Sequence, residues 1–148
     1  MSELALTASS VEAARLEVQL KSKSMKKILI IDDDPDVIAV LQLLLKKKDY
    51  DVATASNEGE AYRQIEAFAP ALIVMDVLLS GVDGREVCRK IKASPASKHI
   101  PVIMFSAHPS AQRNMEEFGA DDFLPKPFES TKLLERIEAL IAKQKQQS

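Results

Sequence analysis

The sequence has few of the features that mark disulfide-bonded, zinc-binding or membrane proteins. One cysteine, Cys88, and two histidines occur in 148 residues, so no internal disulfide can form and no Cys/His cluster is present for zinc. No apolar run approaches the roughly 18 residues of a membrane span. The N-terminus lacks the basic and apolar regions of a secretory signal. We therefore expect a cytoplasmic protein without a membrane partner.

Neither sign of charge dominates the composition. The formal net charge is −2, and the hydrophobic and charged fractions, 46% and 28%, are ordinary for a globular protein. Because nucleic-acid-binding domains usually carry a basic excess, no nucleic-acid partner is expected. The length predicts one domain. Residues 1–24 carry no strand pattern and predict an N-terminal extension (disordered, a short helix or an added leader), so residues 25–148 form the domain.

From Lys26 onward, short apolar runs alternate with segments of helical periodicity. Five such pairs predict an α/β fold with a parallel sheet and helices on both faces. The expected strands are 28–31, 51–55, 72–76, 100–105 and 122–125, and the expected helices are 34–47, 57–68, 84–93, 109–118 and 129–143.

Three expected helix boundaries carry local signals. Asp34 before Pro35 combines an acidic N-cap with proline at the first helical position. Asn57 and Glu60 have the spacing of a capping box. Gly119 follows the fourth expected helix, as a glycine in the left-handed conformation often does.

Polar residues end the expected strands. A strand of four apolar residues ends in Asp76, which alone could either open a turn or belong to a binding site. Asp32 and Asp33 follow the first strand, Ser106 the fourth and Lys126 the fifth, and the carboxyl ends of parallel strands share one edge. If the first and third strands are neighbours, three carboxylates crowd together. Their repulsion, on the order of 1 kcal/mol per pair in water, favours a hard cation such as Mg²⁺.

These groups suit the acceptance of a phosphoryl group. The Asp76 carboxylate would be the nucleophile and would form an aspartyl phosphate. A metal ion and Lys126 would neutralise charge on the phosphoryl oxygens, and Ser106 would donate a hydrogen bond to one of them.

The stretch from Lys26 to Lys143 resembles a response-regulator receiver domain of two-component signalling. The resemblance implies a flavodoxin-like (βα)5 doubly wound parallel sheet with strand order 2-1-3-4-5. The matching segments are Ile28–Pro35, Val74–Gly84, Met104–Ala107 and Leu124–Phe128.

The resemblance also implies a role for each polar residue. Asp76 is the phosphoacceptor and a metal ligand, Asp33 binds Mg²⁺ directly, and Asp32 supports the metal through water. The backbone carbonyl of Leu78 supplies a further metal ligand. Lys126 pairs with the phosphoryl group and is expected to precede a cis peptide bond to proline.

A switch between Ser106 and Phe123 follows from the same resemblance. Phosphorylation would draw Ser106 inward and leave space for Phe123 to turn in, which changes the surface of the fourth helix, fifth strand and fifth helix. The expected partners are a sensor histidine kinase or phosphotransfer protein and a downstream protein target. The chain would be a monomer or weak dimer, and would assist only its own phosphotransfer and dephosphorylation.

Two positions near the expected site have further implications. Ser80 stands where the family usually has proline, so the loop after Asp76 is expected to be less rigid. His108, two residues after Ser106, is expected near the mouth of the site or in a plain loop role.

Two other interpretations remain open. A haloacid-dehalogenase-type phosphohydrolase would use Asp32 and Asp34, with Ser106 after another strand. Asp121-Asp122 would be its second acidic pair. Against it, Asp36 stands where that family has Thr or Val, Lys126 follows this acidic pair where the family's lysine precedes it, and Asp76 would have no role. A degenerate receiver acting as a scaffold is disfavoured by the intact phosphoacceptor, metal ligand and lysine.

Overall fold

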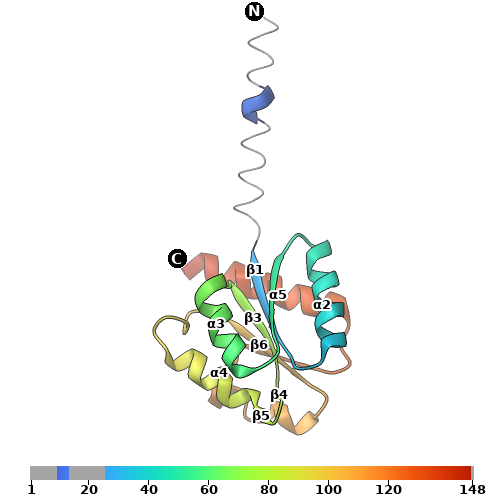
Figure 1. Cartoon of the computed structure of the whole chain (residues 1–148), viewed down its shortest axis with the longest axis vertical. Helices are drawn as coiled ribbons and strands as arrows, with labels where there is room; N and C mark the ends of the chain where they lie inside the picture. The colour runs from blue at the N-terminus through green and yellow to red at the C-terminus, as the bar shows by residue number, and fades with distance from the viewer. Residues whose placement is uncertain (1–9, 14–25, 148) are drawn as a thin grey trace, which may run out of the picture.

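Five apolar runs pair into one parallel sheet in the computed structural model, which describes residues 10–13 and 26–147 (Figure 1). The strand order is β2-β1-β3-β6-β7, so the predicted order of the five main strands is confirmed. Apart from residues 10–13, which are helical, the predicted N-terminal extension lies outside the described residues. The strands are β1 (Lys27–Ile31), β2 (Asp51–Ala55), β3 (Leu72–Asp76), β6 (Val102–Ser106) and β7 (Asp122–Pro125).

Helices cover both faces of the sheet, and each face has its own apolar cluster. Residues of α2 and α5 pack on one face, and residues of α3 and α4 pack on the other. α5 runs four residues further than the sequence predicts. No helix in the described ranges has the length and apolar character to cross a bilayer. The helices are α2 (Pro35–Lys47), α3 (Glu58–Phe68), α4 (Gly84–Ala93) and α5 (Ser130–Gln147).

The central strands are buried on both faces, which explains why they lack polar alternation. Residues 72–75 of β3 are all fully buried. Ile73 and Met75 enter the cluster under α3 and α4, and Leu72 and Val74 enter the cluster under α2 and α5. β1 pairs with both β2 and β3, so the carboxyl ends of β1 and β3 lie side by side.

The predicted caps form, with one difference. The Asp34 carboxylate accepts the backbone N–H of Asp36, and the Asn57 side chain accepts the N–H of Glu60, each at 2.9 Å. The Glu60 carboxylate, however, accepts the N–H of Ser56, also at 2.9 Å, where a capping box would use the N–H of Asn57. The capping box is therefore only half formed.

The α-helix predicted over residues 109–118 is wrong. The segment forms two 3₁₀ turns, although Ala111 and Met115 are buried as a helix would bury them. Ser110 and Asn114 are weak helix formers, which disfavours a continuous α-helix in this segment. The turns are η1 (Pro109–Gln112) and η2 (Glu116–Phe118), and Gly119 follows in the predicted left-handed conformation at φ 83°.

The loop predicted after Asp76 contains a small antiparallel hairpin. β4 (Leu78–Leu79) pairs with β5 (Val82–Asp83), and the turn between them consists of Ser80 and Gly81. Both turn residues have positive φ, 43° and 80°, as two-residue hairpin turns of type I′ require. Asp83 then caps α4 by accepting the N–H of Arg85 at 2.9 Å.

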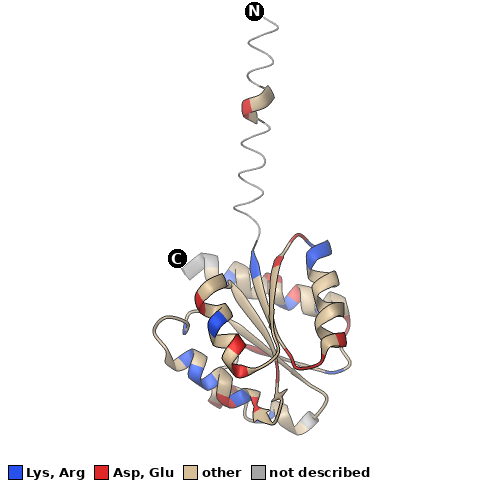
Figure 2. Ribbon diagram, in the orientation of Figure 1, with Lys and Arg blue, Asp and Glu red and all other residues tan. Residues whose placement is uncertain are grey.

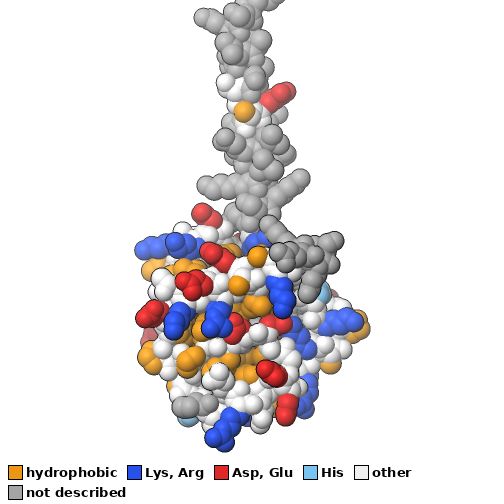
Figure 3. Space-filling model, turned by 180° about the vertical axis from the view of Figure 1, so that it is seen from behind, with side chains coloured by type: hydrophobic (Ala, Val, Ile, Leu, Met, Phe, Trp, Pro, Cys, Tyr) orange, Lys and Arg blue, Asp and Glu red, His pale blue; other side chains and the backbone are white. Residues whose placement is uncertain are grey.

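The back of the molecule, opposite to the view of Figure 1, carries charges of both signs. Figure 3 shows apolar side chains interspersed with Lys, Arg, Asp and Glu, and no continuous basic field on the described part of this face. This distribution agrees with the net charge of −2.

Candidate functional site

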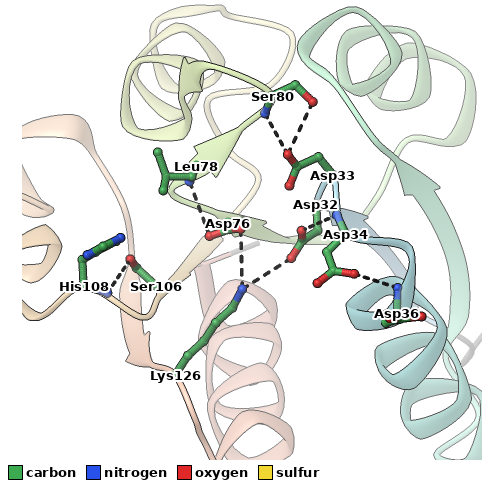
Figure 4. A network of polar contacts seen from close by, with 10 residues as sticks. All are labelled: Asp32, Asp33, Asp34, Asp36, Asp76, Leu78, Ser80, Ser106, His108 and Lys126. Atoms are coloured by element: carbon green, nitrogen blue, oxygen red, sulfur yellow. Dashed lines mark hydrogen bonds and ion pairs between the residues drawn. The ribbon is translucent and has the colours of Figure 1, made fainter.

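The carboxyl ends of four strands bring the predicted polar residues to one place (Figure 4). Asp32 and Asp33 follow β1, Asp76 ends β3, Ser106 ends β6 and Lys126 follows β7. One carboxylate oxygen from each of the three aspartates lies within 4.8 Å of the other two. Figure 2 shows how acidic residues continue along the loop from β1 into α2.

Asp32 is the buried member of this acidic group. Its side chain is fully buried, and its Oδ1 accepts the N–H of Asp34 at 2.9 Å. Its Oδ2 has no hydrogen-bond partner. Loss of solvation raises the pKa of Asp32 to about 6; the N–H of Asp34 opposes the rise, and the nearby charge of Asp76 adds to it. A buried carboxylate oxygen without a hydrogen-bond partner is free to serve as a ligand for a cation.

Lys126 is the cation that faces these carboxylates. Its Nζ lies 3.5 Å from Oδ2 of Asp76 and 3.7 Å from Oδ2 of Asp32. The same atom lies 4.5 Å from the centroid of the Phe105 ring, which packs beneath it. The predicted cis peptide bond between Lys126 and Pro127 is confirmed. One lysine cannot balance three carboxylates, so the site retains a net negative charge.

The donor set fits Mg²⁺. All the converging ligand atoms are carboxylate oxygens, which this hard cation prefers. The unpartnered Oδ2 of Asp32 and the exposed carboxylate of Asp33 leave coordination positions available. Leu78 adjoins the site, since its N–H donates to Oδ1 of Asp76 at 3.4 Å. Its carbonyl as a ligand remains a prediction.

Ser106 and Phe123 lie on the neighbouring strands β6 and β7. Ser106 is buried, and its hydroxyl oxygen accepts the N–H of the exposed His108 at 3.0 Å. Phe123 is 8% exposed and belongs to the apolar cluster under α3 and α4, so its ring already lies inward. The switch between these two residues stays a prediction.

Ser80 makes a contact that sequence reasoning missed. Its backbone N–H donates to Oδ2 of Asp33 at 3.0 Å, across the site from β1 (Figure 4). The sequence carries a signal for the turn, because Ser-Gly between two pairs of strand residues is typical of a tight hairpin turn, but it carries none for the contact with Asp33.

The raised pKa of Asp32 predicts how stability depends on pH in the metal-free protein. The folded state holds a proton that the unfolded state, with a pKa of 3.8, has already released. The free energy of unfolding should therefore fall as pH rises from about 4 through about 6. Urea midpoints in EDTA at about pH 5 and pH 7.5 measure this fall. Asp32→Asn cannot titrate and should show a smaller difference; equal differences in both proteins would contradict the prediction.

Comparisons with known proteins bear on this arrangement. The sequence model of the response regulator receiver domain matches residues 28–138. The chain is 36% identical over 118 residues to the alkaline phosphatase synthesis transcriptional regulatory protein PhoP of Bacillus subtilis, covering 78% of this chain and 48% of that protein. It thus spans about half the length of this curated relative.

Solved structures of receiver domains have a similar fold. A response regulator receiver domain protein (CheY-like) from Methanospirillum hungatei superposes with a TM-score of 0.76 at 28% identity, covering 84% of this chain and 100% of that one. The signal receiver domain of a signal transduction histidine kinase from Syntrophus aciditrophicus gives a TM-score of 0.73 at 32% identity, covering 80% and 91% of the two chains.

Proposed function

Because this chain belongs to the response regulator receiver family, we propose that Asp76 accepts a phosphoryl group from a phosphohistidine on a partner protein. The family match over residues 28–138 favours this function over the haloacid-dehalogenase alternative, which would have used Asp32 and Asp34. The observation that carries the proposal is the convergence of three carboxylates beside Lys126. We also propose that residues 25–148 form the receiver domain.

The proposed transfer is a displacement at phosphorus. A carboxylate oxygen of Asp76 forms the new O–P bond as the P–N bond to the donor imidazole breaks. The electron pair of that bond stays on the imidazole nitrogen, which takes up a proton from solvent. The Asp76 side chain is 13% exposed, so it is open to a partner while the strand behind it fixes its position.

Charge neutralisation is the main task of the surrounding residues. Asp32, Asp33 and Asp76, with the carbonyl of Leu78, would hold Mg²⁺, which when bound neutralises negative charge on the phosphoryl oxygens. Lys126 already lies within 4 Å of two carboxylates and would pair with the incoming phosphoryl group. The hydroxyl of Ser106 would donate a hydrogen bond to a phosphoryl oxygen.

We propose protein partners for both input and output. A sensor histidine kinase or phosphotransfer protein would supply the phosphoryl group in the cytoplasm. The signal would leave through η1, η2, β7 and α5, where a shift of Ser106 toward the phosphoryl group would change the packing around the inward ring of Phe123. The relatives named above are regulators or parts of signalling proteins, which supports this class of partner.

Phosphorylation by a small donor tests the function directly. The protein is incubated with acetyl phosphate and Mg²⁺, and its intact mass is measured. We expect a gain of roughly 80 Da, one phosphoryl group, and no gain when EDTA removes the metal. Absence of the added mass with Mg²⁺, or an equal gain in EDTA, would contradict the proposal.

A further inference from the structure

The turn of the β4–β5 hairpin lies against the acidic site. Ser80 and Gly81 both have left-handed backbone conformations, with φ of 43° and 80°. The hairpin is anchored on one side by Leu79, which is 1% exposed, and on the other by Asp83, the N-cap of α4. The turn is therefore held by packing and by a helix cap, independently of the three carboxylates of the site.

The turn reaches Asp33, the least restrained of the three carboxylates. Asp33 is exposed, whereas Asp32 is buried and Asp76 receives the N–H of Leu78. Packing therefore does not fix the Asp33 side chain. The N–H of Ser80 donates to Oδ2 of Asp33 at 3.0 Å, between residues 47 positions apart in the chain, and the Ser80 hydroxyl lies 3.5 Å from the same oxygen.

We propose that Ser80 is a positioning residue for the metal site, because its backbone N–H holds the Asp33 carboxylate in the orientation that binds Mg²⁺. The inference rests on the metal site of the proposed function. A carboxylate has about four lone-pair positions, so Asp33 can accept this N–H and bind a cation at the same time. Holding the side chain in advance lowers the entropy that metal binding must overcome.

The backbone conformation at position 80 explains why serine suits this role and proline does not. Proline has no N–H to donate, and its ring fixes φ near −65°, far from the 43° observed for Ser80. A proline here would require the sign of φ to change from positive to negative, and it would leave Asp33 without this hydrogen-bond donor. The residue that departs from the family's usual pattern is thus the one that contacts a proposed metal ligand.

Three variants separate the donor from the shape of the turn. Ser80→Pro removes the N–H and also disfavours the positive φ of the turn. Ser80→Gly keeps the N–H and tolerates positive φ. Gly81→Ala strains the turn at φ 80°, although no neighbouring atom lies within 4 Å of its added Cβ, and it leaves the donor in place. Calorimetric titration of each full-length, unphosphorylated protein with Mg²⁺ gives the dissociation constant.

We expect Ser80→Pro to weaken Mg²⁺ binding roughly tenfold, the low end of what loss of a contact to a metal ligand costs. Ser80→Gly and Gly81→Ala should bind within about twofold of the wild type on the same scale, even if Gly81→Ala unfolds at a lower temperature. Wild-type affinity in Ser80→Pro, or an equal loss in Gly81→Ala, would overturn the inference. A wild-type protein that binds no Mg²⁺ would instead contradict the proposed metal site.

A second measurement serves if Ser80→Pro fails to fold. Hydrogen exchange of the Ser80 amide, followed by NMR, should be slow in the wild type and fast in Asp33→Ala, because the variant lacks the carboxylate that accepts this N–H. The variant should still fold, since the exposed Asp33 contributes little to packing. Unchanged protection in Asp33→Ala would show that the amide does not depend on this carboxylate and would overturn the inference.

Discussion

Replacing Asp76 by asparagine is expected to give a folded protein that gains no phosphoryl group from acetyl phosphate and Mg²⁺. The amide nitrogen is not a nucleophile at neutral pH, so no acyl phosphate can form. Asparagine is nearly isosteric and keeps an oxygen that can accept the N–H of Leu78, as Oδ1 does in the wild type. Intact-mass measurement together with circular dichroism separates loss of the acceptor from loss of the fold.

A matched control for this variant comes from the same acidic edge. Asp36 is exposed in the first turn of α2, and the acidic group that converges on the proposed metal site does not include it. Asp36→Asn removes one negative charge near the site and should gain mass as the wild type does. An added phosphoryl group that persists in Asp76→Asn would show that another side chain is the acceptor.

Gly84→Ala is expected to disrupt both the fold and the phosphorylation site. A Cβ on Gly84 would collide with the backbone carbonyl oxygens of Asp76 and Val77. The N–H of Gly84 also donates to the carbonyl of Val77, so the two segments cannot separate freely. Overpacking of this kind typically costs about 1–3 kcal/mol of unfolding free energy. Any relief must displace the backbone that carries the proposed acceptor.

The rate of phosphorylation should therefore fall along with stability. A displacement of about 1 Å at a reacting group can cost roughly a hundredfold in rate, and we expect at least a tenfold loss on that scale. Chemical denaturation and the rate of mass gain measure the two effects. Gly59→Ala in α3 is the control, because its nearest neighbours lie at 3.5 Å and alanine favours helix by about 0.5–1 kcal/mol. Similar behaviour of the two variants would contradict the prediction.

The main strands and the site residues could be predicted because one pattern encodes both. A short run of buried residues followed by a polar one marks the end of a strand and the edge of the sheet, as for Asp76, Ser106 and Lys126. The N-cap of α2 at Asp34 could also be predicted from the sequence, because the cap and the following proline are adjacent in the chain. Signals of this kind depend on neighbouring residues alone.

The features that the sequence did not predict depend on contacts between distant segments. Residues 109–118 have the apolar spacing of a helix, yet they form 3₁₀ turns that are held in part by stacking of Arg89 on Phe118, with the guanidinium carbon 4.5 Å from the ring centroid. The hydrogen bond from Ser80 to Asp33 joins two loops that only the fold brings together. Apolar periodicity reports which residues are buried, but it does not distinguish an α-helix from short 3₁₀ turns.

The burial of β3 on both faces has a consequence for how the chain finds its alignment during folding. A strand that is polar on one face resists a one-residue slip, because the slip would expose its apolar side chains. Leu72, Ile73, Val74 and Met75 offer no such safeguard, since all four are apolar and fully buried. A slip that shifts the strand toward its amino end is opposed by Asp76, because the charge of this residue would be drawn into the core. The proposed phosphoacceptor thus also helps to fix the register of β3 with the neighbouring strands β1 and β6.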